Sequence, residues 1–113
     1  MTKFRDVLVI GAGPVGMTAA LALHKQGLKA TIIEAEEEGR DRAGSRAIYI
    51  HRETLKLLEG ISPGLGFELA NIGVVWPVKK TAYRGEQVYK RVYEPPAPNT
   101  IPAFSSLHQH EIE

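Results

Sequence analysis

Three glycines and one acid near the N-terminus have the types and the spacing of a dinucleotide site. Gly11, Gly13 and Gly16 follow the G-x-G-x-x-G spacing, and Glu34 comes eighteen residues after Gly16. In such a site the first glycine allows a tight turn, the second lets a pyrophosphate approach the backbone, and the third lets a helix pack closely on a strand. The acid accepts hydrogen bonds from ribose hydroxyls and would repel a 2′-phosphate. This motif alone does not separate FAD from NAD.

The elements that would position these residues are a strand, a helix and a second strand. Residues 7–10 form an unbroken apolar run, which is typical of a parallel strand covered on both faces. Pro14 suits the first turn of the following helix, whose N–H groups and positive dipole end would point at phosphates. Gly27 is placed as its left-handed cap, and residues 31–33 form the second strand. One apolar face of the helix is expected to consist of Val15, Ala19, Ala22 and Leu23.

Length and composition are those of one soluble globular domain. The chain has 113 residues, of which 43% are hydrophobic and 24% charged. Lys and Arg number 14 against 13 Asp and Glu, so no net charge favours nucleic acid. The absence of cysteine excludes disulfides and thiolate chemistry. The first apolar run is too short for a signal peptide or a membrane span, which makes the cytoplasm the expected location.

Beyond Glu34 the pattern predicts a charged loop, two helices and a hairpin. The loop covers residues 35–46, where Glu36, Glu37 and Glu38 are expected to be solvated and Arg46 could pair with a pyrophosphate. The helices are expected at residues 51–60, with Leu55 and Leu58 inward, and at residues 63–73, with Leu65, Phe67 or Leu69 inward. The hairpin strands are residues 74–83 and 87–94, with Pro77 marking an edge or an interruption.

The remaining segment predicts an extended connector and the start of a helix. Residues 94–102 are rich in proline, and Ser105 or Ser106 could cap a helix with Glu111 near its positive end. Such a short helix cannot be stable alone, so the C-terminus looks cut. The basic hairpin is expected to be a solvated ribbon rather than a nucleic-acid surface. His108 and His110 lack a third ligand, so no metal site is predicted.

Three stretches carry a family resemblance: the glycine motif through Glu34, GSRAIYIHRETLKLLE at residues 44–59 and LHQHEIE at residues 107–113. Together they resemble the FAD-dependent aromatic-ring monooxygenases, the p-hydroxybenzoate hydroxylase-like flavoproteins. The resemblance implies that Arg46 contacts the flavin cofactor and that Gln109 reaches the ribityl or phosphate region of FAD. It also favours FAD over NAD. The residues that it places at the ADP half of FAD are Gly11, Gly13, Gly16 and Glu34. Pro14 and Val15, which lie in the same motif, are also expected to bind the cofactor.

The fold implied is α/β: a Rossmann-like FAD-binding βαβ unit with an added β-hairpin, in an incomplete domain. Its expected parts are the dinucleotide-binding βαβ unit with the helices that follow it (1–73), the hairpin (74–93) and the connector with the start of a helix (94–113). The function implied is hydroxylation of a small aromatic, phenolic compound with NAD(P)H and O2. The later Gly-Asp motif and most of the substrate domain have no counterpart here, so the remainder of the fold is expected to be missing and the isolated chain inactive. An NAD-dependent oxidoreductase fragment and a non-catalytic binding module are the alternatives.

Overall fold

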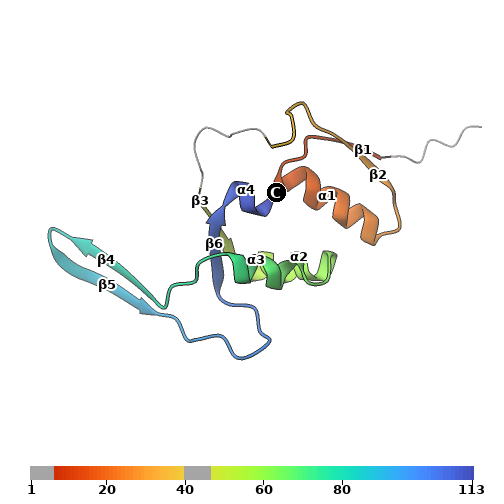
Figure 1. The fold of residues 1–113 in the computed structure, drawn as a ribbon. Helices are drawn as coiled ribbons and strands as arrows, with labels where there is room; N and C mark the ends of the chain where they lie inside the picture. The colour runs from red at the N-terminus through yellow and green to blue at the C-terminus, as the bar shows by residue number, and fades with distance from the viewer. Residues whose placement is uncertain (1–6, 40–46) are drawn as a thin grey trace, which may run out of the picture.

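The computed structural model describes residues 7–39 and 47–113, and the first part is a βαβ unit (Figure 1). Strand β1 (Val7–Ile10) leads into helix α1 (Pro14–Lys25), which returns the chain to strand β2 (Ala30–Ile33). The two strands pair in parallel along their whole length. The predicted order of strand, helix and strand is therefore confirmed.

A left-handed glycine ends helix α1, as predicted. Gly27 has a φ of +77°, and its N–H donates to the carbonyl of His24 at 2.9 Å. The N–H of Leu28 donates to the carbonyl of Leu23 at 3.0 Å. These two hydrogen bonds form a Schellman motif, which satisfies carbonyls of the last helical turn. The chain can therefore reverse direction and enter β2 without an extended loop.

The packed face of α1 is rotated from the predicted one. Val15 is 85% exposed and Ala19 is also exposed, whereas Ala22 and Leu23 are half-buried. Gly16 sets the rotation because its backbone lies directly against the end of β1. The prediction was therefore wrong for Val15 and Ala19, since the helical spacing alone does not fix which side meets the sheet.

One face of the β1–β2 pair is covered by α1 and the other is open. Val7 and Val9 are half-buried on the covered face, whereas Leu8 and Ile10 are 54% and 83% exposed on the other. The apolar run is typical of a strand covered on both faces, and in this chain one of the two faces is left uncovered. The remaining helices pack elsewhere, around a second pair of strands, so the β1–β2 pair keeps an apolar surface in contact with solvent.

The core lies between two helices and this second pair of strands. Helices α2 (Arg52–Ile61) and α3 (Leu65–Ile72) pack on the antiparallel strands β3 (Ala47–His51) and β6 (Phe104–His108). Both helices were predicted, although α2 ends one residue later than expected. Leu65 packs against the core, and Phe67 is half-buried. The buried cluster, which includes the predicted Leu55, Leu58 and Leu69, is Ile50, Leu55, Leu58, Leu69, Ala70 and Leu107.

Strand β6 occupies the place where the sequence predicts the start of a capped helix. Ser105 is fully buried and its hydroxyl donates to the carbonyl of Leu69 at 2.8 Å, so it is not a helix cap. Helix α4 (Gln109–Ile112) begins four residues later than the serine. Its first turn does contain the predicted acid, because the Glu111 carboxylate accepts the N–H of His108 at 3.0 Å. The helical prediction for residues 105–108 was wrong, since pairing with β3 outweighs the local capping signal.

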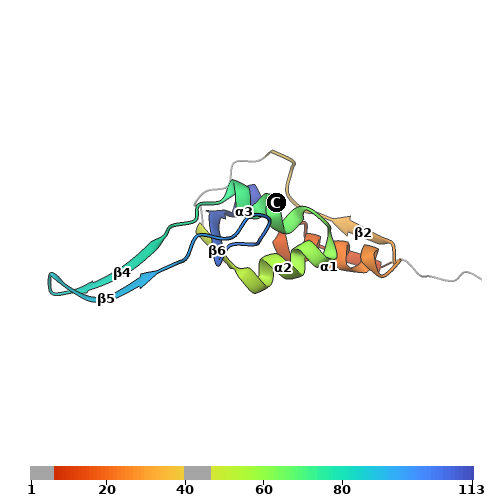
Figure 2. The same cartoon turned by 90° about the horizontal axis from the view of Figure 1, so that it is seen from below.

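A two-stranded hairpin projects from this body (Figures 1 and 2). Strands β4 (Val78–Tyr83) and β5 (Glu86–Val92) are joined by Arg84 and Gly85, with φ of +50° and +83°. Two central residues with positive φ define a type I′ turn, whose twist matches that of the strands. The hairpin is therefore confirmed, and β4 begins directly after Pro77, as the predicted interruption requires.

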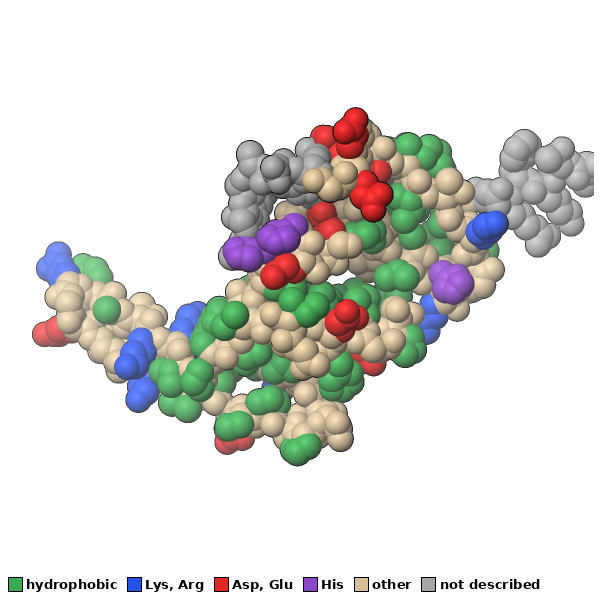
Figure 3. All heavy atoms as spheres, viewed as in Figure 1, with side chains coloured by type: hydrophobic (Ala, Val, Ile, Leu, Met, Phe, Trp, Pro, Cys, Tyr) green, Lys and Arg blue, Asp and Glu red, His purple; other side chains and the backbone are tan. Residues whose placement is uncertain are grey.

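Charge is distributed unevenly over the face shown in Figure 3. Acidic side chains gather over the segment that follows β2, and basic side chains lie along the hairpin. Every residue from Lys79 to Val92 is exposed, as expected for a solvated ribbon. Within residues 7–39 and 47–113, no helix is long and apolar enough to cross a membrane, and no group of three or more potential metal ligands comes together.

The side chain of Glu59 holds the start of α3. Its carboxylate accepts the backbone N–H groups of Gly64 at 2.7 Å, Gly66 at 2.9 Å and Phe67 at 3.3 Å. Backbone N–H groups at a helix start have no intrahelical partner, and a negative charge there is favoured by the helix dipole. Glu59 therefore joins the end of α2 to the beginning of α3.

Glu59→Ala is expected to lower the free energy of unfolding by about 0.5 to 2 kcal/mol, the range for loss of a helix cap. The urea midpoint, followed by the fluorescence of Trp76, the single tryptophan, measures this loss. Glu53→Ala is the matched control, because Glu53 is an exposed acid of α2 whose ion pair with Lys56 is 3.4 Å long. Equal shifts in the two variants would contradict a capping role for Glu59.

Candidate dinucleotide site

The glycine loop lies between the end of β1 and the start of α1. Gly11 has a φ of +105°, a conformation that residues with a Cβ rarely adopt. Its N–H donates to the carbonyl of Ile33 at 2.7 Å, which ties the loop to the end of β2. Pro14 occupies the first helical turn, where a missing N–H costs nothing. The predicted tight turn is therefore present at Gly11.

Gly16 and Gly13 differ in what an added side chain would meet. A Cβ at Gly16 would lie 1.9 Å from the carbonyl oxygen of Gly11 and 3.3 Å from Cγ1 of Val9, so the protein itself requires glycine there. Among the described residues, a Cβ at Gly13 would meet no atom within 4 Å. The space beside Gly13 is thus open, and it is the space that a pyrophosphate needs in order to approach the backbone. The loop fits a dinucleotide.

The start of α1 offers backbone donors to this space. Gly13 is the N-cap residue, it supplies no side-chain cap, and the first turn of α1 contains no acid. The first intrahelical bond runs from the N–H of Met17 to the carbonyl of Gly13 at 3.0 Å. The N–H groups of Val15 and Gly16 come before that bond, at the positive end of the helix dipole. An anion placed beside Gly13 would be attracted by these groups.

Glu34 lies at the mouth of the same loop. One carboxylate oxygen accepts the N–H of Ala12 at 2.6 Å, and the other accepts the N–H of Glu36 at 3.1 Å. A carboxylate oxygen can accept more than one hydrogen bond, so ribose hydroxyls could add to these contacts. Its negative charge disfavours a 2′-phosphate. The donor at Ala12 escaped sequence analysis because any residue other than proline supplies a backbone N–H.

Two further residues, Arg46 and Gln109, were predicted to contact the cofactor. Arg46 lies outside the described residues. Gln109 begins α4, and its side-chain amide donates to Glu113 Oε1 at 2.9 Å. The end of α4 lies beside the start of α1 in both views (Figures 1 and 2). The structure thus brings the glycine loop and Glu34 together and places α4 next to them.

Comparison with known proteins identifies the family. The profile of the FAD binding domain family matches residues 5–113. The chain belongs to the FAD binding domain family. This membership confirms the predicted choice of FAD over NAD. The matched residues include the glycine loop, the core and the hairpin.

Solved members of this fold resemble the chain over nearly its whole length. The tetrameric form of 2-methyl-3-hydroxypyridine-5-carboxylic acid oxygenase matches 98% of this chain at 27% identity, with a TM-score of 0.73. The p-nitrophenol 4-monooxygenase of Pseudomonas putida DLL-E4 matches 96% at 26% identity, with a TM-score of 0.70. These matches confirm the predicted Rossmann-like FAD-binding fold and the predicted resemblance to aromatic-ring monooxygenases.

A third protein is more identical over a shorter stretch. The human lysine-specific histone demethylase 2 is 37% identical over 67 residues, which is 59% of this chain. The two monooxygenase structures therefore match far more of the FAD binding domain than the demethylase does. The chain spans 28% of each solved chain and 7% of the demethylase.

Proposed function

We propose that the glycine loop and Glu34 bind the ADP half of FAD. The observation that carries this proposal is the open space at Gly13, where the packing of residues 7–39 and 47–113 gives no reason to exclude a side chain. The pyrophosphate would lie there against the N–H groups of Val15 and Gly16, and the ribose hydroxyls would donate to Glu34. The residues of this chain bind and orient the cofactor and keep its phosphates at the start of α1.

Arg46 and Gln109 are proposed to contact the rest of the cofactor. The proposal for Arg46 rests on the family resemblance and on the suitability of a guanidinium for pairing with phosphate oxygens. That for Gln109 rests on the resemblance and on the position of α4 beside the start of α1 (Figure 1).

The proposed reaction of the whole protein is hydroxylation of a small aromatic compound. Two similar solved structures are an oxygenase of a hydroxypyridine carboxylic acid and a monooxygenase of p-nitrophenol, and both names describe a single hydroxylated ring. FAD, when bound, would supply the redox chemistry, with NAD(P)H as the proposed reductant and O2 as the proposed oxidant. The cytoplasmic location expected from the sequence stays a prediction.

Competition between nucleotides tests whether the glycine loop and Glu34 bind the ADP half of FAD. The chain, carried as a fusion to a soluble carrier protein, is titrated into FAD while flavin fluorescence is followed, with the carrier alone as the blank. ADP is expected to displace FAD because the glycine loop and Glu34 bind the ADP half of FAD. FMN is expected not to displace FAD, because FMN lacks the adenylate. ADP carrying a 2′-phosphate should compete less well than ADP because of Glu34. Displacement by FMN but not by ADP would overturn the proposal.

Arg46→Ala is expected to weaken FAD binding by about 1.5 to 3 kcal/mol, the range for a hydrogen bond to a charged group. This loss corresponds to a dissociation constant raised by roughly tenfold to a hundredfold or more. Arg84→Ala is the matched control, because Arg84 lies in the exposed turn of the hairpin. An unchanged FAD affinity in Arg46→Ala would show that this arginine is a surface charge.

A further inference from the structure

The glycine loop is held to the end of β2 at two consecutive residues. The N–H of Gly11 donates to the backbone carbonyl of Ile33 at 2.7 Å, and the N–H of Ala12 donates to Oε2 of Glu34 at 2.6 Å. The first hydrogen bond needs no particular side chain at residue 33. The second exists because residue 34 carries an acceptor long enough to reach the loop. Glu34 therefore takes part in the geometry of the loop before any ligand binds.

Ala12 lies between the two glycines whose backbone shapes the loop. Gly11 has a φ of +105°, and Gly13 is extended, with φ −77° and ψ −179°. The atoms of a peptide group lie close to one plane, so the hydrogen bond of the Ala12 N–H fixes the orientation of the peptide group between residues 11 and 12. The chain then enters Gly13 from a fixed direction. The contact with Glu34 thus helps to decide which way the backbone of Gly13 faces.

The Glu34 side chain is itself fixed in this position. It is exposed, and its second oxygen accepts the N–H of Glu36 at 3.1 Å. Hydrogen bonds from N–H groups to a carboxylate are shorter and about twice as strong as those between neutral groups. Two such bonds, one to each oxygen, hold the side chain between the loop and the segment after β2. A bound ligand therefore does not have to order this side chain.

Electrostatics separates the contact with the loop from the contact with ribose. The carboxylate of Glu34 has the same sign of charge as the pyrophosphate proposed beside Gly13, so its charge alone disfavours that anion. Ribose hydroxyls offset this repulsion only in a ligand that has them. Support of the loop through Ala12 favours the pyrophosphate whether or not the ribose carries hydroxyls. For a ligand without these hydroxyls, the charge of Glu34 and its support of the loop thus act in opposite directions.

We propose that Glu34 positions the glycine loop for the pyrophosphate, in addition to accepting the ribose hydroxyls. The hydrogen bond from Ala12 keeps the loop in the conformation in which Gly13 and the start of α1 meet the phosphates. This inference rests on the proposed function, since it assumes that the glycine loop binds the ADP half of FAD. Its consequence is that even a ligand without ribose hydroxyls depends on the length of the side chain at residue 34.

The test uses 2′,3′-dideoxyadenosine diphosphate as a probe, because this molecule keeps the adenine and both phosphates of ADP and lacks both ribose hydroxyls. Phosphorus NMR follows the line broadening of the probe and of ADP with the full chain, carried as a fusion to a soluble carrier protein. The carrier alone is the blank. The wild-type chain is expected to bind both ligands and to bind ADP more tightly.

Two variants separate the length of the side chain from its charge. Glu34→Asp keeps the charge but is one methylene shorter, so it no longer reaches Ala12. Its affinity for the probe is expected to fall by about tenfold, the size for a lost hydrogen bond to a charged group. Glu34→Gln loses the charge but keeps an oxygen at the same distance along the side chain, so it can still accept the Ala12 N–H. Glu34→Gln is expected to bind the probe more tightly than Glu34→Asp does.

Glu34→Met provides a second comparison if Glu34→Asp does not fold. It has the length of the glutamine variant and lacks the same charge, but its sulfur is only a weak acceptor. Glu34→Met is therefore expected to bind the probe more weakly than Glu34→Gln. Loss of charge cannot produce this difference, because both side chains are neutral.

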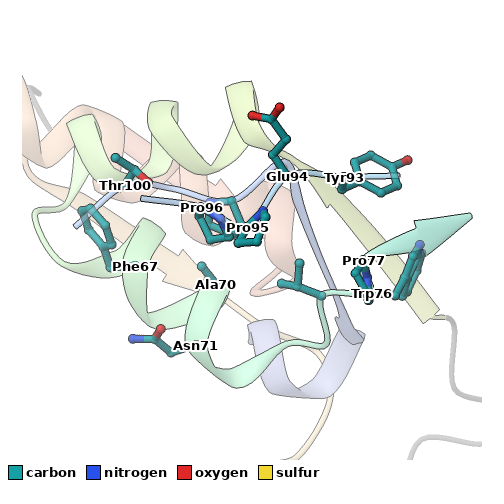
Figure 4. Close-up of a pocket in the computed structure, with 12 residues that line it drawn as sticks. Phe67, Ala70, Asn71, Trp76, Pro77, Tyr93, Glu94, Pro95, Pro96 and Thr100 are labelled. Atoms are coloured by element: carbon teal, nitrogen blue, oxygen red, sulfur yellow. The ribbon is translucent and has the colours of Figure 1, made fainter. Parts of the chain in front are cut away.

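Glu37→Gln and Glu94→Gln control for the loss of one negative charge elsewhere. Glu37 is an exposed acid of the segment after β2. Glu94 is an exposed acid at the base of the hairpin, where its carboxylate points away from the neighbouring prolines (Figure 4). Both variants are expected to bind the probe at least as tightly as the wild-type chain, because they remove only repulsion.

A role for charge alone would give a different order of affinities. Glu34→Gln and Glu34→Met would then bind the probe equally, and Glu34→Asp would bind it as tightly as the wild-type chain does. This result would overturn the inference, as would binding of ADP by the wild-type chain without any binding of the probe. Absence of ADP binding by the wild-type chain would overturn the proposed function itself, so the two failures are distinguishable.

Discussion

Replacing Gly13 by valine is expected to abolish FAD binding while leaving the fold nearly intact. Gly13 has φ −77° and ψ −179°, an extended conformation that valine adopts readily. A Cβ there would meet no atom of the part of the chain that the structure describes within 4 Å, so this part has room for it. The same side chain would occupy the space that the pyrophosphate needs beside the helix start. The loss of a good N-cap residue costs about 0.5 to 2 kcal/mol, which is small beside complete loss of the ligand.

Gly16→Ala is the matched comparison for this variant. The added Cβ would lie 1.9 Å from the Gly11 carbonyl oxygen, so α1 would have to move away from β1. This variant is expected to lose stability and FAD binding together, whereas Gly13→Val loses binding alone. FAD titration and urea unfolding of both variants separate the two effects. If Gly13→Val retained FAD stoichiometrically, the proposal that the pyrophosphate lies beside Gly13 would be refuted.

The geometry of the glycine loop could be predicted from the sequence because the constraints there are local. The positive φ at Gly11 disfavours a Cβ and the close approach at Gly16 excludes one, so the spacing of the glycines reports the backbone geometry directly. Gly27 likewise reports the left-handed turn after α1. The same holds for the hairpin, where Arg84 and Gly85 supply the two positive φ values of the turn. The conformation of these turns therefore depends mainly on residues within the turn itself.

The failures concern contacts between distant parts of the chain. Ser105 resembles a helix cap locally, but its hydroxyl meets the carbonyl of Leu69, 36 residues away in sequence. The exposure of Val15 depends on how α1 is rotated against β1, which its apolar spacing leaves open. Trp76 and Tyr93 both pack on the ring of Phe104, which only the packed structure brings near them. Non-local pairing decides these features, and a single sequence does not display it.

The isolated 113-residue chain is expected to self-associate and to lack monooxygenase activity. The open face of the β1–β2 pair exposes Leu8 by 54%, Ile10 by 83% and Ile33 by 51%. Within the described residues, β1 and β2 each also keep one unpaired edge, which is a template for pairing with another chain. A contiguous exposed apolar face of this kind favours association over a monomer.

Light scattering during gel filtration, together with urea unfolding with and without FAD, measures this association. Leu8→Lys is expected to reduce it, because a charge on the open face opposes stacking of two copies. Val88→Lys on the hairpin, where Val88 is 60% exposed, is the control and is expected to leave it unchanged. Suppression by Val88→Lys alone would instead identify the hairpin as the associating surface.

Added FAD is not expected to rescue the monomer. A ligand stabilises the state that binds it by RT ln(1 + [L]/Kd), which is about 2.7 kcal/mol even at a hundredfold excess over the dissociation constant. FAD bound beside Gly13 would leave the apolar face at Leu8 and Ile10 as exposed as before, because these side chains lie on the sheet face away from α1. Oxidation of NAD(P)H in the presence of phenols is therefore expected to stay at the level of free FAD. A cooperative monomeric transition accompanied by phenol-dependent turnover would contradict this prediction, and it would mean that the exposed β1–β2 face is compatible with both folding and catalysis.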